Sequence, residues 1–128
     1  MAAFTETELA YLRTQRLGRL ATVRPDGTVQ NNPVGFGYND KLQTIDIGGR
    51  NMAASRKFRN VAAGSKVAFV VDDIVSLDPW AVRCVEIRGD AEALTESTDS
   101  AAHMAGAIIR IHPRRIVSFG LEPATGPR

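Results

Sequence analysis

The chain has 128 residues, a length that suits one domain with a core of modest size. Apolar residues make up 44% of it and charged residues 23%, as in ordinary globular proteins. The net charge of +2 is too small for a general nucleic-acid binder, and no apolar run approaches the roughly 20 residues of a membrane helix. Residues 1–6 lack the features of a signal peptide, and the single cysteine, Cys84, excludes an internal disulfide. We therefore expect one cytoplasmic domain over residues 1–128 that neither spans a membrane nor binds nucleic acid.

The N-terminal part of the chain predicts one helix and then strands joined by tight turns. Thr5 and Glu8 have the spacing of a capping box, which indicates the start of a helix. In the turn over residues 24–27, Pro25 and Gly27 supply the backbone angles that a tight turn needs. Pro33 predicts an edge strand or a bulge, because proline cannot donate to a strand ladder. The expected elements are a helix over 5–15 and strands over 18–23, 28–32, 34–38 and 43–47.

The rest of the chain predicts two more helices and four more strands. Gly48 and Gly49 break the strand pattern, and a helix is expected to follow, with Asn51 as its N-cap and Gly64 just beyond its end. The alternation within residues 80–90 places Cys84, Glu86 and Arg88 on one face of a strand and Val85 and Ile87 on the other. The expected elements are helices over 52–63 and 96–107 and strands over 66–71, 80–90, 108–112 and 115–119. Because strands outnumber helices, the pattern favours a mainly β fold, an antiparallel barrel with a few helices.

One segment, residues 47–71, contains no acidic residue but five cations. Like charges repel, so the cluster is either a solvated helix face or a binding site for an anion. It follows a Gly-Gly break at the start of a helix, and it mixes arginine, which grips phosphate with two donors, with lysine, a point charge. We therefore interpret the segment as a phosphate site in which Arg56 and Lys57 bind and Ser55 adds a hydroxyl donor. The glycine motifs of a P-loop or a Rossmann site are absent.

Three stretches, taken together, resemble the pyridoxamine 5′-phosphate oxidase superfamily of flavin-binding split-barrel proteins. They are the hairpin at residues 20–28, the segment 55–71 with Ser55-Arg56-Lys57 and Asn60, and the strand at 83–89. The resemblance covers about residues 5–120. It implies an FMN-binding split barrel, with six or seven antiparallel strands and short flanking helices. It also implies a homodimer whose cofactor sites lie at the interface.

Three further stretches resemble the actinobacterial branch that uses coenzyme F420, the flavin/deazaflavin oxidoreductases. They are residues 32–36, 47–52 and 110–118. Residues 31–36 lack the Arg and Lys with which the oxidase holds the FMN phosphate, and Cys84 replaces a glutamine. Residues 119–123 replace the C-terminal substrate motif of the oxidase. Oxidation of a vitamin B6 phosphate is therefore not expected, and the cofactor is expected to be coenzyme F420, with FMN as the alternative.

The residues expected to bind the cofactor fall into three groups along the chain. They are Asn32, Pro33 and Val34; then Arg50, Asn51, Met52, Ser55, Arg56 and Lys57; and finally Trp80 and Arg83, from the other chain of the dimer. Deazaflavins and flavins carry the hydride chemistry themselves, so we name no catalytic residue. The resulting hypothesis is an F420-dependent oxidoreductase that reduces a small organic substrate. The alternatives are an FMN-dependent oxidoreductase and a carrier that binds the cofactor without turnover.

Other candidate sites have weaker support in the sequence. His103 and His112 lack further ligands at metal-binding spacing, so no metal is expected. Phe58 is the only aromatic residue between the first and last cations of the basic segment, Arg50 and Lys66, which argues against stacking on nucleic acid. Trp80 can either cover a ring system or fill a gap in the core, and the sequence leaves both open.

Overall fold

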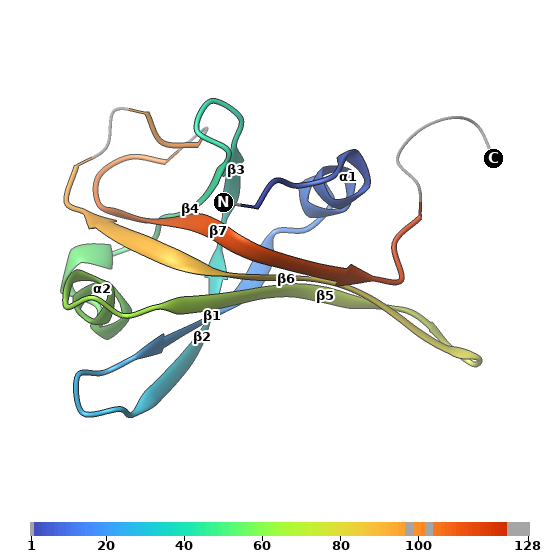
Figure 1. Ribbon diagram of the computed structural model, residues 1–128, viewed down its shortest axis with the longest axis horizontal. Coiled ribbons are helices and arrows are strands. Elements are labelled where there is room, and N and C mark those ends of the chain that lie inside the picture. The colour runs from blue at the N-terminus through green and yellow to red at the C-terminus, as the bar shows by residue number, and fades with distance from the viewer. Residues whose placement is uncertain (1, 97–98, 102–103, 123–128) are drawn as a thin grey trace.

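The computed structural model describes residues 2–96, 99–101 and 104–122 of the chain. In this part, one antiparallel sheet of seven strands curls into a half-barrel (Figure 1). The two α-helices lie on opposite sides of the view in Figure 1. The elements are α1 (Glu6–Arg13), β1 (Leu17–Val23), β2 (Val29–Gly35), β3 (Gly37–Asn39), β4 (Thr44–Ile47), the 3₁₀ turn η1 (Met52–Ala54), α2 (Arg56–Ala62), β5 (Val67–Leu77), β6 (Trp80–Leu94) and β7 (Ile108–Phe119). The mainly β split-barrel fold expected from the sequence is confirmed.

The strand order is β2-β1-β5-β6-β7-β4-β3, so β2 and β3 are the two edges of the sheet. Only Phe36 separates these edges along the chain, and the sheet therefore has to curl. The concave face holds the core, in which Leu20, Phe69 and Ile87 are fully buried. Gly18 leaves room for this packing, because a Cβ on it would lie 2.3 Å from the Phe69 ring. The expected alternation in β6 is confirmed, since Val85 is buried together with Ile87.

Capping and one buried carboxylate fix α1 on the barrel. The Thr5 hydroxyl accepts from the backbone N–H of Glu8 at 3.1 Å, and the Glu8 carboxylate accepts from the N–H of Thr5 at 2.9 Å. The predicted capping box is thus confirmed. The Ser118 hydroxyl donates to the other oxygen of Glu8 at 2.6 Å and ties α1 to β7. The helix ends at Arg13, two residues before the expected end.

The prediction of one continuous helix over 52–63 is wrong. Ser55 has an extended backbone (ψ 153°) that separates η1 from α2. Its hydroxyl accepts from the N–H of Phe58 at 3.2 Å, so Ser55 is the N-cap of α2. Asn51 lies in the left-handed region with φ +54° and makes no capping bond with its side chain, which corrects its predicted role. Gly64, with φ +101°, follows the end of α2 as expected.

The predicted helix over 96–107 is also wrong in the described residues, which form bends and irregular chain. There the backbone N–H of Ala101 donates to the buried Asp46 carboxylate at 2.9 Å instead of to a helix ladder. Pro33 lies on an edge strand as predicted, but it does not interrupt β2, which breaks only at Phe36. The two expected C-terminal strands form one strand, β7, with a register shift against β6 after Arg88.

Candidate functional site

A cavity of about 540 Å³ lies where β2 and β4 end. Gly35 and Phe36 line it at the end of β2, and Gly48 and Gly49 line it after β4. The other lining residues are Gln15, Arg16, Met104 and Ala105. Because the glycines have no side chains, their backbone atoms are accessible from the cavity. A Cβ on Gly48 would lie 3.5 Å from Cγ of Met104, which also lines the cavity. Two stretches predicted separately as cofactor-binding, 32–34 and 50–52, do not line this cavity themselves, but each is next in the chain to residues that do.

The structure gives the first predicted group, on β2, three different environments. Val34 belongs to the core. Asn32 is half-buried, and its side-chain oxygen accepts from Nε2 of Gln30 at 2.6 Å. Pro33 is exposed on the convex face, paired with Arg19 of β1. Asn32 and the backbone of β2 are thus the parts of this group that can approach a ligand.

The second group lies on the connection from β4 to α2. Arg50 and Asn51 are exposed, whereas Met52 is buried in the core. The Ser55 hydroxyl donates to the Met52 carbonyl at 2.6 Å, so its proton, which was predicted to bind a phosphate, already has an acceptor in the chain. Arg56 and Lys57, half-buried, open α2. The cations of this connection are its main candidates for holding an anion.

Ion pairing separates the cations of the described chain into two classes. Eight lie within 4 Å of an acid: Arg13, Arg19, Lys41, Lys66, Arg83, Arg88, Arg110 and Arg114. Those without such a pair in the described residues are Arg16, Arg24, Arg50, Arg56, Lys57, Arg59 and Arg115. Most of this second class lies on α2, on the connection before it and on the β1–β2 turn. Positive charge is therefore left free in one region of the molecule.

Sequence reasoning missed one member of this region, Arg24, because it lies outside the acid-free run. The neighbouring charges of Arg24 and then Arg59, together with partial burial, lower the pKa of Arg56. Mutual repulsion of this kind is relieved when an anion binds between the cations. No sequence signal pairs the residue before Pro25 with a helix about 30 residues later, so only the fold reveals this neighbour.

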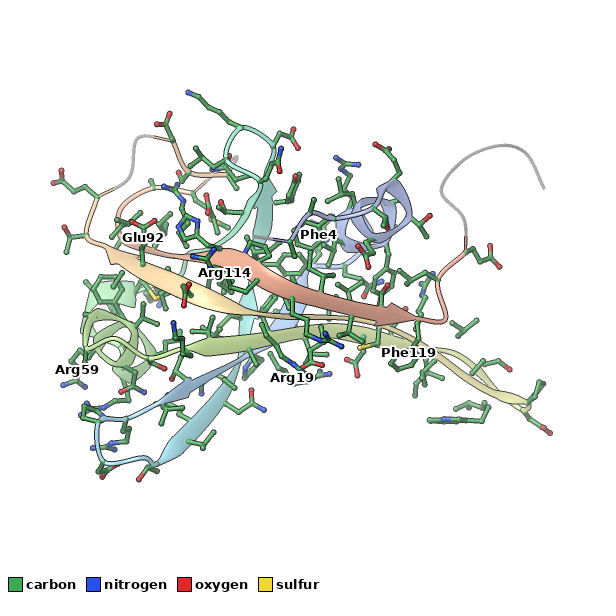
Figure 2. All side chains as sticks on the ribbon, viewed as in Figure 1. Phe4, Arg19, Arg59, Glu92, Arg114 and Phe119 are labelled. Atoms are coloured by element: carbon green, nitrogen blue, oxygen red, sulfur yellow. The ribbon has the colours of Figure 1, made fainter. Side chains whose placement is uncertain are left out.

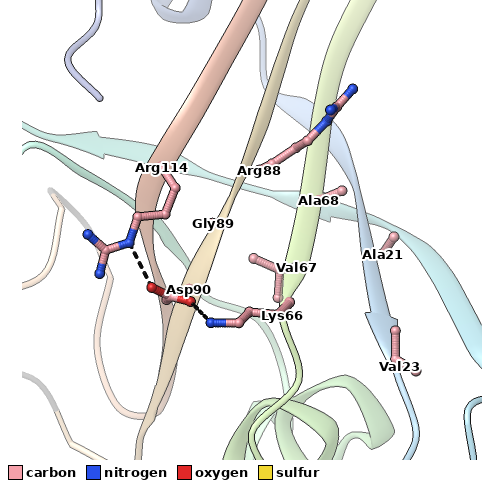
Figure 3. Close-up of a pocket in the computed structure, with 9 residues that line it drawn as sticks. All are labelled: Ala21, Val23, Lys66, Val67, Ala68, Arg88, Gly89, Asp90 and Arg114. Carbon is pink, nitrogen blue, oxygen red and sulfur yellow. Dashed lines mark hydrogen bonds and ion pairs between the residues drawn. The ribbon is translucent and has the colours of Figure 1, made fainter. Parts of the chain in front are cut away.

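A second, larger cavity of about 680 Å³ lies on the convex face of β1, β5, β6 and β7 (Figure 3). Its floor is apolar, with Ala21 and Ala68 among its residues. Asp90 accepts from Nζ of Lys66 on one side and from Nε of Arg114 at 2.7 Å on the other. These two cations lower the pKa of Asp90 and are themselves neutralised by it. The cavity therefore offers less free charge than α2, although Lys66 belongs to the predicted basic segment.

Comparison with known proteins identifies the family of the chain. A family model described as pyridoxamine 5′-phosphate oxidase matches residues 4–122. The chain belongs to this family. The predicted resemblance is thus confirmed for nearly the whole chain.

Relatives of this pyridoxamine 5′-phosphate oxidase family member include an enzyme of known substrate. The 5a,11a-dehydrotetracycline/5a,11a-dehydrooxytetracycline reductase of Streptomyces rimosus subsp. rimosus is 52% identical over 120 residues, which cover 93% of this chain and 84% of the relative. The conserved hypothetical protein Rv2991 of Mycobacterium tuberculosis is 24% identical with a TM-score of 0.70, over 92% of this chain and 86% of its own. The FAD-binding protein of Mycobacterium smegmatis is 19% identical with a TM-score of 0.67, over 93% of this chain and 97% of its own. The two structures share the fold.

In this family member, Trp80 lies at the turn of the β5–β6 hairpin, whereas Arg83 lies nearer to the cavity at the ends of β2 and β4, because its partner Asp73 also accepts from Nε2 of the lining residue Gln15 at 3.4 Å. The hairpin of β5 and β6 projects away from α2 and carries both residues (Figure 1). Trp80 is 66% exposed, so it does not fill a gap in the core of its own chain. Arg83 donates to both carboxylate oxygens of Asp73 at 2.7 and 2.9 Å and lies over the Tyr11 ring. Within one chain, Trp80 therefore lies away from the other two groups, and Arg83 is held in an ion pair beside the cavity lining.

Two further titratable candidates lie in the described residues, His112 and Cys84. His112 contacts a Glu92 carboxylate oxygen at 2.5 Å, and His103 lies outside the described residues. Burial, followed by the charges of Asp72 and Glu86, raises the pKa of Cys84, which makes its thiol a weak nucleophile. The described residues hold no group of three side chains suited to a metal, and neither described α-helix is long and apolar enough to span a membrane.

Proposed function

We propose that the protein is an F420-dependent reductase that adds hydride to an electron-poor carbon–carbon double bond of a polycyclic substrate. One observation carries this proposal: 52% identity, over 93% of the chain, to a reductase of dehydrotetracyclines. When bound, the reduced cofactor supplies the hydride. The protein supplies binding, orientation and shielding from water.

The free cations fit a cofactor with a phosphate or an acidic tail. Arg50, Arg56 and Lys57 would hold the anionic part, since they have no acid of their own in the described residues. Charge-assisted hydrogen bonds of this type are roughly twice as strong as neutral ones. Residues 31–36, which span the end of β2 and Phe36 after it, offer amide and apolar groups but no cation, which supports the deazaflavin over FMN.

The cavity at the ends of β2 and β4 fits the cofactor ring. Its glycine-rich lining lets a flat ring approach the backbone closely, and its volume of about 540 Å³ suits one such ligand. Asn32 would present its amide from one side. Gly48 and Gly49 would form the other side, next to the cations that follow them in the chain.

We further propose that two copies form a homodimer. The projecting hairpin and the adjoining end of β7 expose large apolar side chains: Ile74, Val75, Leu77, Trp80 and Phe119 (Figure 2 labels Phe119). Exposed apolar patches of this kind mark interaction sites. A second copy would cover them, and Trp80 with Arg83 would then approach the cofactor bound by the partner.

Separate titrations with coenzyme F420 and FMN test the cofactor, and substrate turnover tests the activity. We expect tighter binding of F420, together with oxidation of reduced F420 that depends on added dehydrotetracycline. Tight binding of FMN with no binding of F420 would make FMN the cofactor instead of F420. If the protein binds F420 but reduces none of a panel of polycyclic enones, the alternative of a cofactor carrier without turnover would be favoured.

A further inference from the structure

The turn between β1 and β2 faces α2, and Arg24, at the start of this turn, lies next to the helix. The turn is closed by two backbone hydrogen bonds, from Arg24 N–H to the Thr28 carbonyl and from Gly27 N–H to the Arg24 carbonyl, each 2.8 Å. A small cavity of about 180 Å³ lies between the turn and the helix. Arg24 lines it from one side, and Asn60 and Ala63 line it from α2.

Two contacts fix the helix against the strand that leads into this turn. Asn60 is 1% exposed, and its Nδ2 donates to the Thr22 hydroxyl at 2.9 Å. The backbone N–H of Val23 donates to the Ser65 hydroxyl at 2.9 Å, just beyond α2. Arg56 precedes Asn60 by four residues and so shares its face of the helix, toward the turn.

Three arginines therefore gather from two elements that are far apart in the chain. Arg24, Arg56 and Arg59 have no ion pair among the described residues (Figure 2 labels Arg59). The acid on the turn, Asp26, accepts from the N–H of Thr28 at 2.9 Å and lies within 4 Å of no arginine nitrogen in the described residues. Its charge acts on Arg24 and Arg56, but the repulsion from Arg24 and Arg59 outweighs it and lowers the pKa of Arg56. Because hydrogen bonds hold the two elements together, the backbone positions that carry the arginines are fixed relative to one another.

We propose that Arg24 completes an anion subsite with Arg56 and Arg59, which receives a phosphate or a carboxylate of the cofactor. This inference rests on the proposed function and adds to it a ligand-binding residue from a second element. It also restricts the cofactor to a molecule with an anionic group beyond its ring. Two arginines from α2 and one from the turn would surround that group, and guanidinium donors suit phosphate and carboxylate geometry.

The test compares Arg24→Gln with Arg115→Gln in the full-length protein. Both residues are exposed arginines without an ion pair in the described residues, but Arg115 lies on β7, outside the subsite. We expect Arg24→Gln to weaken F420 binding about tenfold while leaving the phosphate-free deazaflavin chromophore unaffected. Arg115→Gln should match the wild type for both ligands. Because Arg24 is exposed, the thermal midpoint should not change.

Inorganic pyrophosphate separates this proposal from the proposed function. We expect it to raise the thermal midpoint of the wild type and of Arg115→Gln, but not that of Arg24→Gln. If the wild type binds neither F420 nor FMN and pyrophosphate still gives this pattern, the proposed function fails and the anion subsite stands. Equal ligand affinities and equal pyrophosphate responses in Arg24→Gln and Arg115→Gln would overturn the subsite.

Discussion

At the scale of single residues, Lys57 and Arg56 are the strongest predicted contacts to the cofactor. We expect Lys57→Ala to weaken F420 binding tenfold or more, because a hydrogen bond to a charged group contributes about 1.5–3 kcal/mol. The fold should be unaffected, since the side chain has no ion pair among the described residues. Isothermal titration measures the affinity. Lys41→Ala is the matched control, because Lys41 is exposed and pairs with Asp99.

Unchanged affinity in both Lys57→Ala and Arg56→Ala would contradict the phosphate site. If only Lys57→Ala loses affinity for F420, Lys57 binds the anionic group, and the arginines contact another part of the ligand. Melting curves of both variants are needed beside the titrations.

The buried residue with the largest predicted effect on stability is Asp46. Its carboxylate, 0% exposed, accepts from Nε of Arg110 at 3.0 Å and from Asn39 and Thr44 at 2.9 Å each. We expect Asp46→Asn to lower the free energy of unfolding by about 3–5 kcal/mol, because it leaves a buried guanidinium without its counter-charge. Urea denaturation measures this. Asp40→Asn, at an exposed partner of Arg13, should change stability by less than about 1 kcal/mol.

Asp46 also predicts the direction of the pH dependence. Burial alone raises its pKa, but hydrogen bonds, the first of them from Arg110, outweigh burial and lower it. A carboxyl group with a lowered pKa in the folded state stabilises the protein above its unfolded pKa of about 3.9, and this contribution is lost as the pH falls through the folded value. The wild type should therefore lose more stability below about pH 4 than Asp46→Asn. Parallel acid profiles for the two proteins would contradict this role.

At the scale of elements, close backbone approach decides which strands can pair. A Cβ on Gly89 would lie 2.2 Å from the His112 carbonyl oxygen, where β6 and β7 shift register. We expect Gly89→Ala to destabilise the protein by about 1–3 kcal/mol or more, since the clashing atom belongs to the backbone. Gly35→Ala is the control, because the nearest atom to its Cβ, the Arg16 carbonyl oxygen, is 3.9 Å away. Equal thermal midpoints for the two variants would rule out the steric argument.

At the scale of the whole molecule, the exposed apolar hairpin predicts self-association. Light scattering at micromolar concentration should give about twice the 13.9 kDa mass of one chain. Leu77→Ser should shift the protein toward monomer, because Leu77 is 74% exposed at the end of the hairpin and its apolar surface would be buried between copies. Val29→Ser, at an equally exposed residue of the β2 edge, is the control.

Cofactor binding links the dimer to the site. If Trp80 reaches the cofactor of the partner, Trp80→Ala should weaken F420 binding even at concentrations where the dimer persists. A clean monomer that binds F420 with full affinity would place the whole site within one chain. Trp80 and Arg83 would then have no part in it.

Local sequence patterns were enough to predict where most strands lie, though not all of their ends, and to predict the first helix cap and the basic segment. Alternation placed Val85 and Ile87 in the core, and the spacing of Thr5 and Glu8 placed the first cap, because both signals act between neighbours in the chain. The family followed from three motifs in order and is confirmed over residues 4–122. The acid-free run also identified most of the free cations, since a missing acid is visible in sequence.

The tertiary structure alone decided features that depend on contacts between distant residues. The stretch 96–107 has helical composition, but Asp46 takes the N–H of Ala101, and nothing in the local sequence indicates that bond. Arg83 was predicted to approach the cofactor of the partner chain, which stays a prediction, but its contacts with Asp73 and Tyr11 in its own chain had no sequence signal. Arg24 joins the cations of α2 only because β1 packs on that helix. Each outcome depends on a pairing across the fold, and local patterns carry no information about such partners.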